Sequence, residues 1–325
     1  MSDALTVEAI GWAAITDLGR RATHLGQSVG GALDQLSARL ANALVGNTAD
    51  RPLIELMAQG GRFRVHRDLL LALTGSIVAT VDENPIRPYQ PLVVRGGQLL
   101  AIERIEPGLR GYLAVRGGFA AQSLLGSCAP DAFIGFGALL EAGDVLGSSD
   151  DVALGGLLRG QLLTRVGVED VIAPDPDTIE VTVGPHATQF GDVDRLYAEE
   201  YVVSHRSNQV GLRLAGRVPQ ERAAAEIRSS GVPIGAVEVP GGDELLVLHR
   251  SRGVTAGYPV VAVATSFGLD TLAQVRPGQR VRFRLVEVAD AVRRARLQRQ
   301  QIETVARRAA GLFEGLGLPR IGDVR

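Results

Sequence analysis

The sequence predicts a mainly β protein made of two domains. Glycine accounts for 40 of the 325 residues, which suits many tight turns between short strands. Runs of valine, leucine and isoleucine with the length of a buried strand recur along the chain. A proline and aspartate run at 174–177 cannot continue a central strand and is typical of a linker. We therefore divide the chain into an N-terminal β-barrel domain, residues 1–170, and a C-terminal one, residues 171–325.

The predicted strands follow from these apolar runs and their flanking turn residues. They are 62–65, 69–73, 91–94, 98–102, 111–115, 180–183, 210–214, 236–239, 245–249, 260–264 and 280–288. Pro240, two glycines and Asp243 separate strands 236–239 and 245–249, which indicates a hairpin. In strand 280–288 apolar residues alternate with arginines, so one face should be buried and the arginines should form a solvated face.

Two segments favour helix instead. Between residues 32 and 45, leucines recur at spacings of three and four, and Gly46 with Asn47 supplies a C-terminal stop. Residues 290–313 are rich in alanine, arginine and glutamine and carry one loose apolar stripe, which predicts an amphipathic helix. That helix would lie on the last barrel or contact a partner.

Composition excludes several classes of protein. A net charge of -2 and a hydrophobic content of 46% are typical of a globular protein that binds neither nucleic acid nor a membrane surface. No apolar run approaches the roughly 18 residues that a membrane span needs, and the first residues lack the basic region of a signal peptide. The single cysteine, Cys128, favours a reducing compartment. We expect a cytoplasmic protein.

The absence of lysine narrows the possible chemistry, because all 34 cationic residues are arginine. A Walker A phosphate loop and a Schiff base both require lysine, and so does covalent attachment of biotin, so this chain carries none. The five histidines show no metal-ligand spacing, and we expect no metal site. Cys128 has no histidine near it in sequence and no nucleophile elbow is present, which indicates a buried thiol.

Three clusters combine polar residues with glycine. In the first, Asp17, Gly19 and Arg20 precede a long loop, which is either a turn with an ion pair or a loop that holds a ligand against a helix N-terminus. In the second, SHRSNQVG offers hydrogen-bond donors and acceptors for an amide or carboxylate, although turns use the same residues. The third, TAGYP at 255–259, places a tyrosine at the start of a buried strand, either as a bulge at a barrel rim or as part of a ligand site.

Taken in order, these clusters resemble the KipA family, whose members include the C subunit of 5-oxoprolinase, allophanate hydrolase subunit 2 and the carboxyltransferase region of urea carboxylase. The resemblance covers residues 15 to 290. It rests on Asp17, Gly19, Arg20, 31–34 (GALD), 44–47 (LVGN), Ser207, Asn208, Gly211, Arg213, Gly216, Gly231, Gly235, Val239, Pro240, Thr255, 257–259 (GYP), 272–274 (LAQ), Pro277 and Gly278.

The resemblance implies two cyclophilin-like β-barrel domains and a smaller KipI-like partner protein. With that partner, family members act on 5-oxoproline with ATP, or transfer carboxylate from biotin to an amide such as urea. Both reactions activate a small lactam, amide or urea, and a carbonyl of that kind needs convergent donors for its developing oxyanion. ATP is therefore the cofactor that the resemblance implies, in this chain or in the complex.

The sequence departs from the family pattern near the third cluster. The usual QTTGGYP is replaced by residues Gly253, Val254, Thr255 and Ala256 ahead of GYP, and the usual VQVP has become VEVP, with Glu238 in place of glutamine. Glu238 would repel an anionic lactam through its like charge.

We predict a subunit of a 5-oxoprolinase-like, ATP-dependent amidohydrolase that acts on a small lactam or amide with a KipI-like partner. Catalytic roles are assigned to Asp17, Arg20 and Glu238, and substrate binding to Ser207, Asn208, Arg213, Thr255 and Tyr258. Two alternatives stay open. One is a non-catalytic regulator that binds the KipI-like kinase inhibitor, and the other is the carboxyltransferase of a biotin-dependent urea or amide enzyme.

Overall fold

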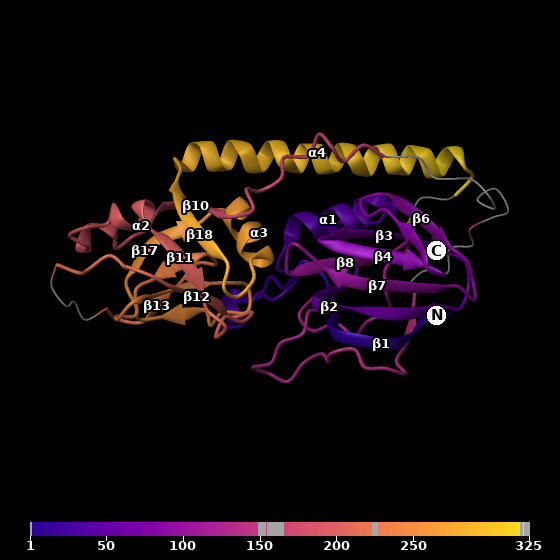
Figure 1. Cartoon of the computed structure of the whole chain (residues 1–325), viewed down its shortest axis with the longest axis horizontal. Helices are drawn as coiled ribbons and strands as arrows, with labels where there is room; N and C mark the ends of the chain where they lie inside the picture. The colour runs from indigo at the N-terminus through magenta and orange to yellow at the C-terminus, as the bar shows by residue number, and fades with distance from the viewer. Residues whose placement is uncertain (1, 149–153, 155–165, 223–226, 319–320, 322–325) are drawn as a thin grey trace. The chain divides into compact units, whose positions relative to one another are not determined.

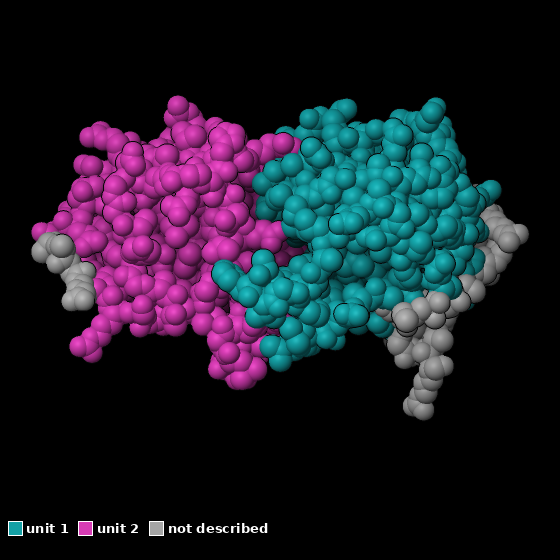
Figure 2. Space-filling model, turned by 90° about the horizontal axis from the view of Figure 1, so that it is seen from below, with its two compact units in different colours: residues 1–19, 35–172, 298–325 teal, residues 20–34, 173–297 magenta. Residues whose placement is uncertain are grey.

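A computed structural model describes residues 2–148, 154, 166–222, 227–318 and 321. The chain forms two compact units, which Figure 2 colours separately. Unit 1 contains residues 1–19, 35–172 and 298–325, and unit 2 contains residues 20–34 and 173–297. The prediction divided the chain once, near residue 170. In the structure, segment 20–34 belongs to unit 2 and segment 298–325 belongs to unit 1, so each joins the other half of the sequence. The prediction of a mainly β fold is confirmed.

Unit 1 is built on a nine-stranded antiparallel sheet, shown in indigo to magenta in Figure 1. The order is β5-β4-β7-β2-β8-β3-β6, and β1 pairs with both β2 and β9. The strands are β1 (Asp3–Thr16), β2 (Leu53–Val65), β3 (Leu69–Gly75), β4 (Ile77–Val81), β5 (Asn84–Ile86), β6 (Pro91–Val94), β7 (Leu99–Ile105), β8 (Arg110–Val115) and β9 (Val145–Gly147).

Strand β1 was not predicted, and its register explains why. Its pairing with β2 shifts between Val7 and Ala9 and again between Ile10 and Trp12. At the first shift β1 advances two residues while β2 advances one, so the side chains that follow lie on the other face of the sheet, which breaks the two-residue alternation by which a strand is recognised.

Helix α1 (Gln35–Leu44) packs against β3 and β8 of the same unit. The prediction placed its start at residue 32, but residues 32–34 lie outside the helix and α1 begins at Gln35. Gly30 and Gly31, just before the predicted start, have left-handed φ values of 61° and 86°, which keep the preceding turn out of the helix. The side chain of Thr74 on β3 donates a hydrogen bond of 2.7 Å to the carbonyl of Ser37, which fixes the helix to the sheet.

Unit 2 is a closed barrel in the order β10-β17-β14-β15-β12-β11-β18 (Figure 1). Strand β10 closes it by pairing parallel with β18, and the other neighbours are antiparallel. Its elements are η1 (Thr23–Leu25), β10 (Thr178–Val183), η3 (Ala187–Gln189), α2 (Arg195–Ala198), β11 (Glu200–Val203), β12 (Gly211–Ala215), β13 (Ser230–Gly231), β14 (Ala236–Glu238), β15 (Glu244–Leu248), β16 (Thr255–Ala256), β17 (Val260–Ala264), α3 (Ser266–Gln274) and β18 (Arg280–Leu285).

Alternate residues of each strand fill the barrel interior, among them Val181, Leu214, Val237 and Val261. The predicted hairpin is confirmed, because β14 and β15 pair antiparallel across the glycine turn. Helix α3 was not predicted. Thr265 caps it by accepting a hydrogen bond of 3.2 Å from the backbone N–H of Gly268.

The last predicted strand is too long. Pairing of β18 with β10 ends at Leu285 opposite Val181, and the backbone N–H of Val286 still reaches the Val181 carbonyl at 2.9 Å. Helix α4 (Val288–Gly315) then begins, as the predicted C-terminal helix. No helix in the described ranges has the length and apolar character required to cross a membrane.

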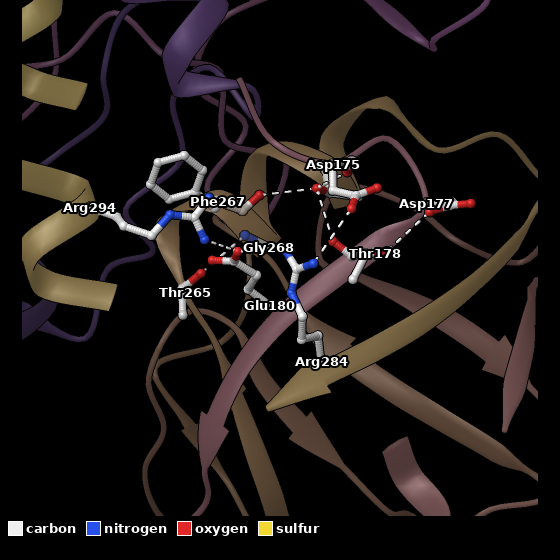
Figure 3. A network of polar contacts seen from close by, with 10 residues as sticks. Asp175, Asp177, Thr178, Glu180, Thr265, Phe267, Gly268, Arg284 and Arg294 are labelled. Atoms are coloured by element: carbon white, nitrogen blue, oxygen red, sulfur yellow. Dashed lines mark hydrogen bonds and ion pairs between the residues drawn. The ribbon is translucent and has the colours of Figure 1, made fainter. Parts of the chain in front are cut away.

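Within unit 2 a buried ion-pair network fixes the first turns of α4 to the barrel (Figure 3). The side chain of Glu180 on β10 is 3% exposed and accepts a hydrogen bond of 2.8 Å from Arg284 on β18. Arg294 on α4 binds the same carboxylate oxygen, and its guanidinium lies 4.4 Å from the ring centroid of Phe267. All three arginines of β18 are therefore paired and largely solvated, Arg280 and Arg282 with the exposed Glu200 and Arg284 with the buried Glu180.

Replacement of Glu180 tests this network. Glu180→Ala should lower the free energy of unfolding by about 2 kcal/mol, because it removes the charge-assisted hydrogen bonds by which β18 and α4 bind one buried carboxylate. Chemical denaturation measures the change. The control Glu200→Ala removes exposed pairs with Arg280 and Arg282 and should cost less than about 1 kcal/mol. Equal losses in the two variants would contradict a special role for Glu180.

Candidate functional site

Asp17, which follows β1, organises a loop of unit 1. Its side chain is buried and its Oδ1 accepts hydrogen bonds from the Gly19 backbone at 2.8 Å and the Ser127 hydroxyl at 2.6 Å. Its Oδ2 accepts from the backbone N–H of Cys128 at 2.8 Å. Asp17 therefore joins two loops that are far apart in sequence. A direct part in catalysis stays a prediction.

Arg20 lies in unit 2, so the chain passes from one unit to the other within the DLGR motif. Gly19 has a φ of 96°, a left-handed conformation that favours glycine at this point. The Arg20 side chain is buried, and its backbone N–H donates to the Val29 carbonyl at 2.7 Å.

Ser207 and Asn208 shape the loop between β11 and β12. The Ser207 hydroxyl accepts from the Arg213 backbone N–H at 3.0 Å, and Asn208 Oδ1 accepts from Val210 and Gly211 at 2.9 and 3.3 Å. These bonds are those of a side-chain-stabilised turn. They position Arg213, whose half-buried side chain reaches Glu244 at 3.4 Å.

Glu238 lies on the outer face of the barrel, although it is only 1% exposed. In the sheet it stands opposite Leu246 on β15 and Val260 on β17. Directly opposed residues share a face, and Val260 belongs to an apolar cluster with Val232 that is separate from the barrel interior. Glu238 is therefore an acid buried beside apolar side chains outside the barrel wall.

No hydrogen-bond partner among the described residues reaches Glu238 Oε1, which is fully buried. Burial in these surroundings raises the pKa of the Glu238 carboxyl to about 7, since desolvation disfavours the charged form. The carboxyl is thus close to half protonated at neutral pH.

A small two-stranded sheet, formed by segments that are distant in sequence, lies on the same side as Glu238. Strands β13 and β16 pair through Ser230 with Ala256 and Gly231 with Thr255. Val232, next in the chain, belongs to the apolar cluster on this face, and Ala256 packs against that cluster.

Arg252, which the sequence analysis missed, binds the chain immediately after β13 of this small sheet. It is 6% exposed and donates from Nε and Nη2 to the Val232 carbonyl at 3.0 and 2.6 Å. Its Nη1 is buried without a hydrogen-bond partner in the described parts of the chain, and burial lowers the pKa of the guanidinium. An arginine just before the TAGYP cluster was the available sequence signal, but a lone loop arginine is usually solvated.

Sheet register brings two predicted residues into one row. Arg213 on β12 stands opposite Leu246, and Leu246 stands opposite Glu238. With neighbouring strands about 5 Å apart, the Cα atoms of Arg213 and Glu238 are roughly 10 Å apart on the same face. His186 lies beside Val260, because its Nδ1 accepts a hydrogen bond of 2.9 Å from the Val260 backbone N–H.

Thr255 and Tyr258 lie at the edge of this face. Thr255 is exposed on β16, and Tyr258 is 49% exposed in the turn that leads into β17. The structure thus gathers Arg213, Glu238, Thr255 and Tyr258 on the outside of one barrel. Within the described residues no group of three or more histidine, cysteine, aspartate or glutamate side chains could hold a metal ion.

Comparison with known proteins gives the family. A sequence profile described as carboxyltransferase domain, subdomain A and B, matches residues 25–285. The chain belongs to this family. The resemblance inferred from the sequence clusters is confirmed, since the curated relatives carry the names of its members.

The relatives differ in how much of them this chain spans. The C subunit of 5-oxoprolinase from Haemophilus influenzae is 30% identical over 302 residues, which are 91% of this chain and 95% of that protein. Urea amidolyase of Lachancea kluyveri is 29% identical over 80% of this chain but only 15% of its own length. The crystal structure of TTHA0988 has a TM-score of 0.76 and 36% identity, covering 87% of this chain and 55% of that one.

The raised pKa of Glu238 predicts how stability depends on pH. The carboxyl pKa is about 7 in the folded chain against an ordinary 4.5, so the folded state binds more protons between these values. The free energy of unfolding should therefore fall as pH rises through this window, by up to about 3 kcal/mol from this group.

Glu238→Gln should remove that dependence. We expect the variant to be more stable than the wild type above pH 7 and similar to it in mild acid, as measured by chemical denaturation at both pH values. Glu244→Gln, at a partly exposed and paired carboxylate, is the control. A stability difference independent of pH would contradict the raised pKa.

Proposed function

We propose that this chain is a subunit of a 5-oxoprolinase-like, ATP-dependent amidohydrolase that acts on a small lactam or amide together with a KipI-like partner protein. The observation that carries the proposal is the buried carboxyl of Glu238, whose Oε1 has no partner among the described residues. Alignment over nearly the whole length of a 5-oxoprolinase component supports it.

Hydrolysis of a lactam needs a group that gives and takes a proton near neutral pH. When the ring C–N bond breaks, the leaving nitrogen must receive a proton, and water must deliver a hydroxyl to the carbonyl carbon. A carboxyl with a pKa of about 7 suits both transfers: protonated Glu238 would donate to nitrogen and recover a proton from water. Because the group is then neutral for part of the cycle, it does not exclude an anionic lactam by charge.

Cationic and hydroxyl side chains on the same face would bind the charged groups of such a substrate and line the way to Glu238. Arg213 shares the row of Glu238 and lies roughly two strand spacings away. A guanidinium there would bind a substrate carboxylate or the developing oxyanion. Thr255 and Tyr258 would line the entrance, and Ser207 and Asn208 would hold the loop that presents Arg213.

For ATP, the described residues provide no recognisable site. The chain has no lysine for the phosphates, and its acidic side chains form no metal-binding group in the described ranges. We therefore assign no residue to the nucleotide and place ATP binding in the complex with the partner. Asp17 and Arg20 would contribute by fixing the loops around the DLGR motif.

The carboxyltransferase alternative is supported by the family description and by the urea amidolyase relative. The chain corresponds to only 15% of that enzyme, and without lysine it would need a biotin carrier on another chain. The regulatory alternative needs the partner but no turnover. Both are distinguished from the proposal by the same assay.

The assay uses the chain co-purified with its KipI-like partner and follows ATP hydrolysis with and without 5-oxoproline. We expect stimulation by 5-oxoproline that declines as pH rises above about 7, because Glu238 must be protonated to donate to the leaving nitrogen, and a loss of stimulation of at least about a hundredfold in Glu238→Gln. Glu200→Gln is the matched control on the same barrel. A stable complex without stimulation would contradict the hydrolase proposal and favour one of the two alternatives.

Tyr258→Ala tests the entrance to the site. The side chain is half exposed, so the fold should be kept, with a change of melting temperature of no more than about 2 °C. We expect a several-fold rise in KM for the lactam, measured with the same complex. Unchanged KM and kcat would make the turn purely structural.

A further inference from the structure

A long segment of unit 1 exposes apolar side chains and no charge. Residues 118–140 follow β8 and run in loops beside β1 (Figure 1), where the Leu140 backbone donates to Ala13 at 2.9 Å. The one charged residue in the segment, Asp131, is 4% exposed. The exposed apolar side chains are Leu125 at 47%, Phe133 at 67%, Ile134 at 47% and Leu139 at 48%.

The tip of this segment is a well-defined turn. Asp131 and Phe136 exchange backbone hydrogen bonds of 2.8 and 3.0 Å, and Asp131 Oδ1 accepts from the Phe133 backbone at 2.9 Å. The base of the segment is held by Asp17 through Ser127 and Cys128. Phe133 and Ile134 are therefore displayed by fixed backbone, which reduces the entropy lost when such side chains are buried in an interface.

The same segment also forms a hollow of about 240 Å³. Its walls are mostly apolar and include Ile15, Ala121, Pro130, Phe136, Leu139 and Leu140, with Gln122 and Asp144 as polar members. This volume is smaller than the roughly 300 to 1,000 Å³ of sites for drug-sized ligands. A largely apolar hollow of this size suits an inserted side chain better than a separate molecule.

We propose that residues 118–140 form a two-fold interface with a second copy of this chain, in which Phe133 of each copy enters the hollow of the other. A two-fold interface is self-complementary, so projection and hollow must both be present on one surface, and here they occur in one segment. A residue close to a two-fold axis faces the same residue of the other copy, so an exposed charge there would be repelled by an identical charge. The absence of exposed charge from this segment fits that requirement.

Cross-linking gives a direct test, because Cys128 lines the hollow and is the one cysteine of the chain. In the Phe133→Cys variant, the new thiol should lie near Cys128 of the other copy. Under mild oxidation we expect a covalent dimer on non-reducing gels, with peptide mapping showing the 133–128 linkage. Phe133→Cys combined with Cys128→Ser should lose that linkage, and Val292→Cys, at an exposed apolar position on α4, should not form it.

Sedimentation velocity of the unmodified chain completes the test. We expect a concentration-dependent dimer that Phe133→Ser weakens at least about tenfold, and that Ala138→Trp weakens by filling the hollow, while Val292→Ser leaves it unchanged. Circular dichroism checks that each variant is folded, and Ile134→Ser provides a second change at the tip. A monomeric wild type, a dimer insensitive to Phe133→Ser, or loss of KipI-like partner binding in place of self-association would overturn the proposal. None of these outcomes depends on whether the complex hydrolyses 5-oxoproline.

Discussion

Closure of the barrel in unit 2 is the constraint on which the candidate site depends. The parallel pair of β10 and β18 joins the two ends of the sheet, so each strand has one face toward a filled interior and one face outward. Val237 and Val247 occupy the interior, and their neighbours Glu238 and Leu246 must then lie outside. The register that closes the barrel is therefore also what aligns Arg213, Leu246 and Glu238.

Two buried carboxylates of this unit show that the role of a carboxylate depends on whether a cationic side chain pairs with it. Glu180 receives Arg284 and Arg294 and serves to fix helix α4 on the barrel (Figure 3). Glu238 has a similar burial but no such partner among the described residues, and its pKa rises to about 7. A carboxylate paired with two arginines holds structural elements together, whereas desolvation without pairing makes one available for proton transfer.

Unit 1 uses a buried acid for a different purpose. Asp17 satisfies donors from Gly19, Ser127 and Cys128, and so fixes the base of the segment that displays Phe133. A residue of the family motif thus acts through loop architecture, and the proposed interface is a consequence of that anchoring.

The sequence by itself determined the features that depend on neighbouring residues: apolar alternation predicted the mainly β class, leucine spacing predicted α1, and the ordered motifs indicated the family. Bulges concealed β1, because they disturb the local period. Tertiary structure alone decided which distant residues meet. The row of Arg213 and Glu238 depends on strand pairing across the barrel, and the contact of Asp17 with Ser127 spans 110 positions. No local pattern encodes these features, because hydrogen bonds and burial form between segments that the sequence separates.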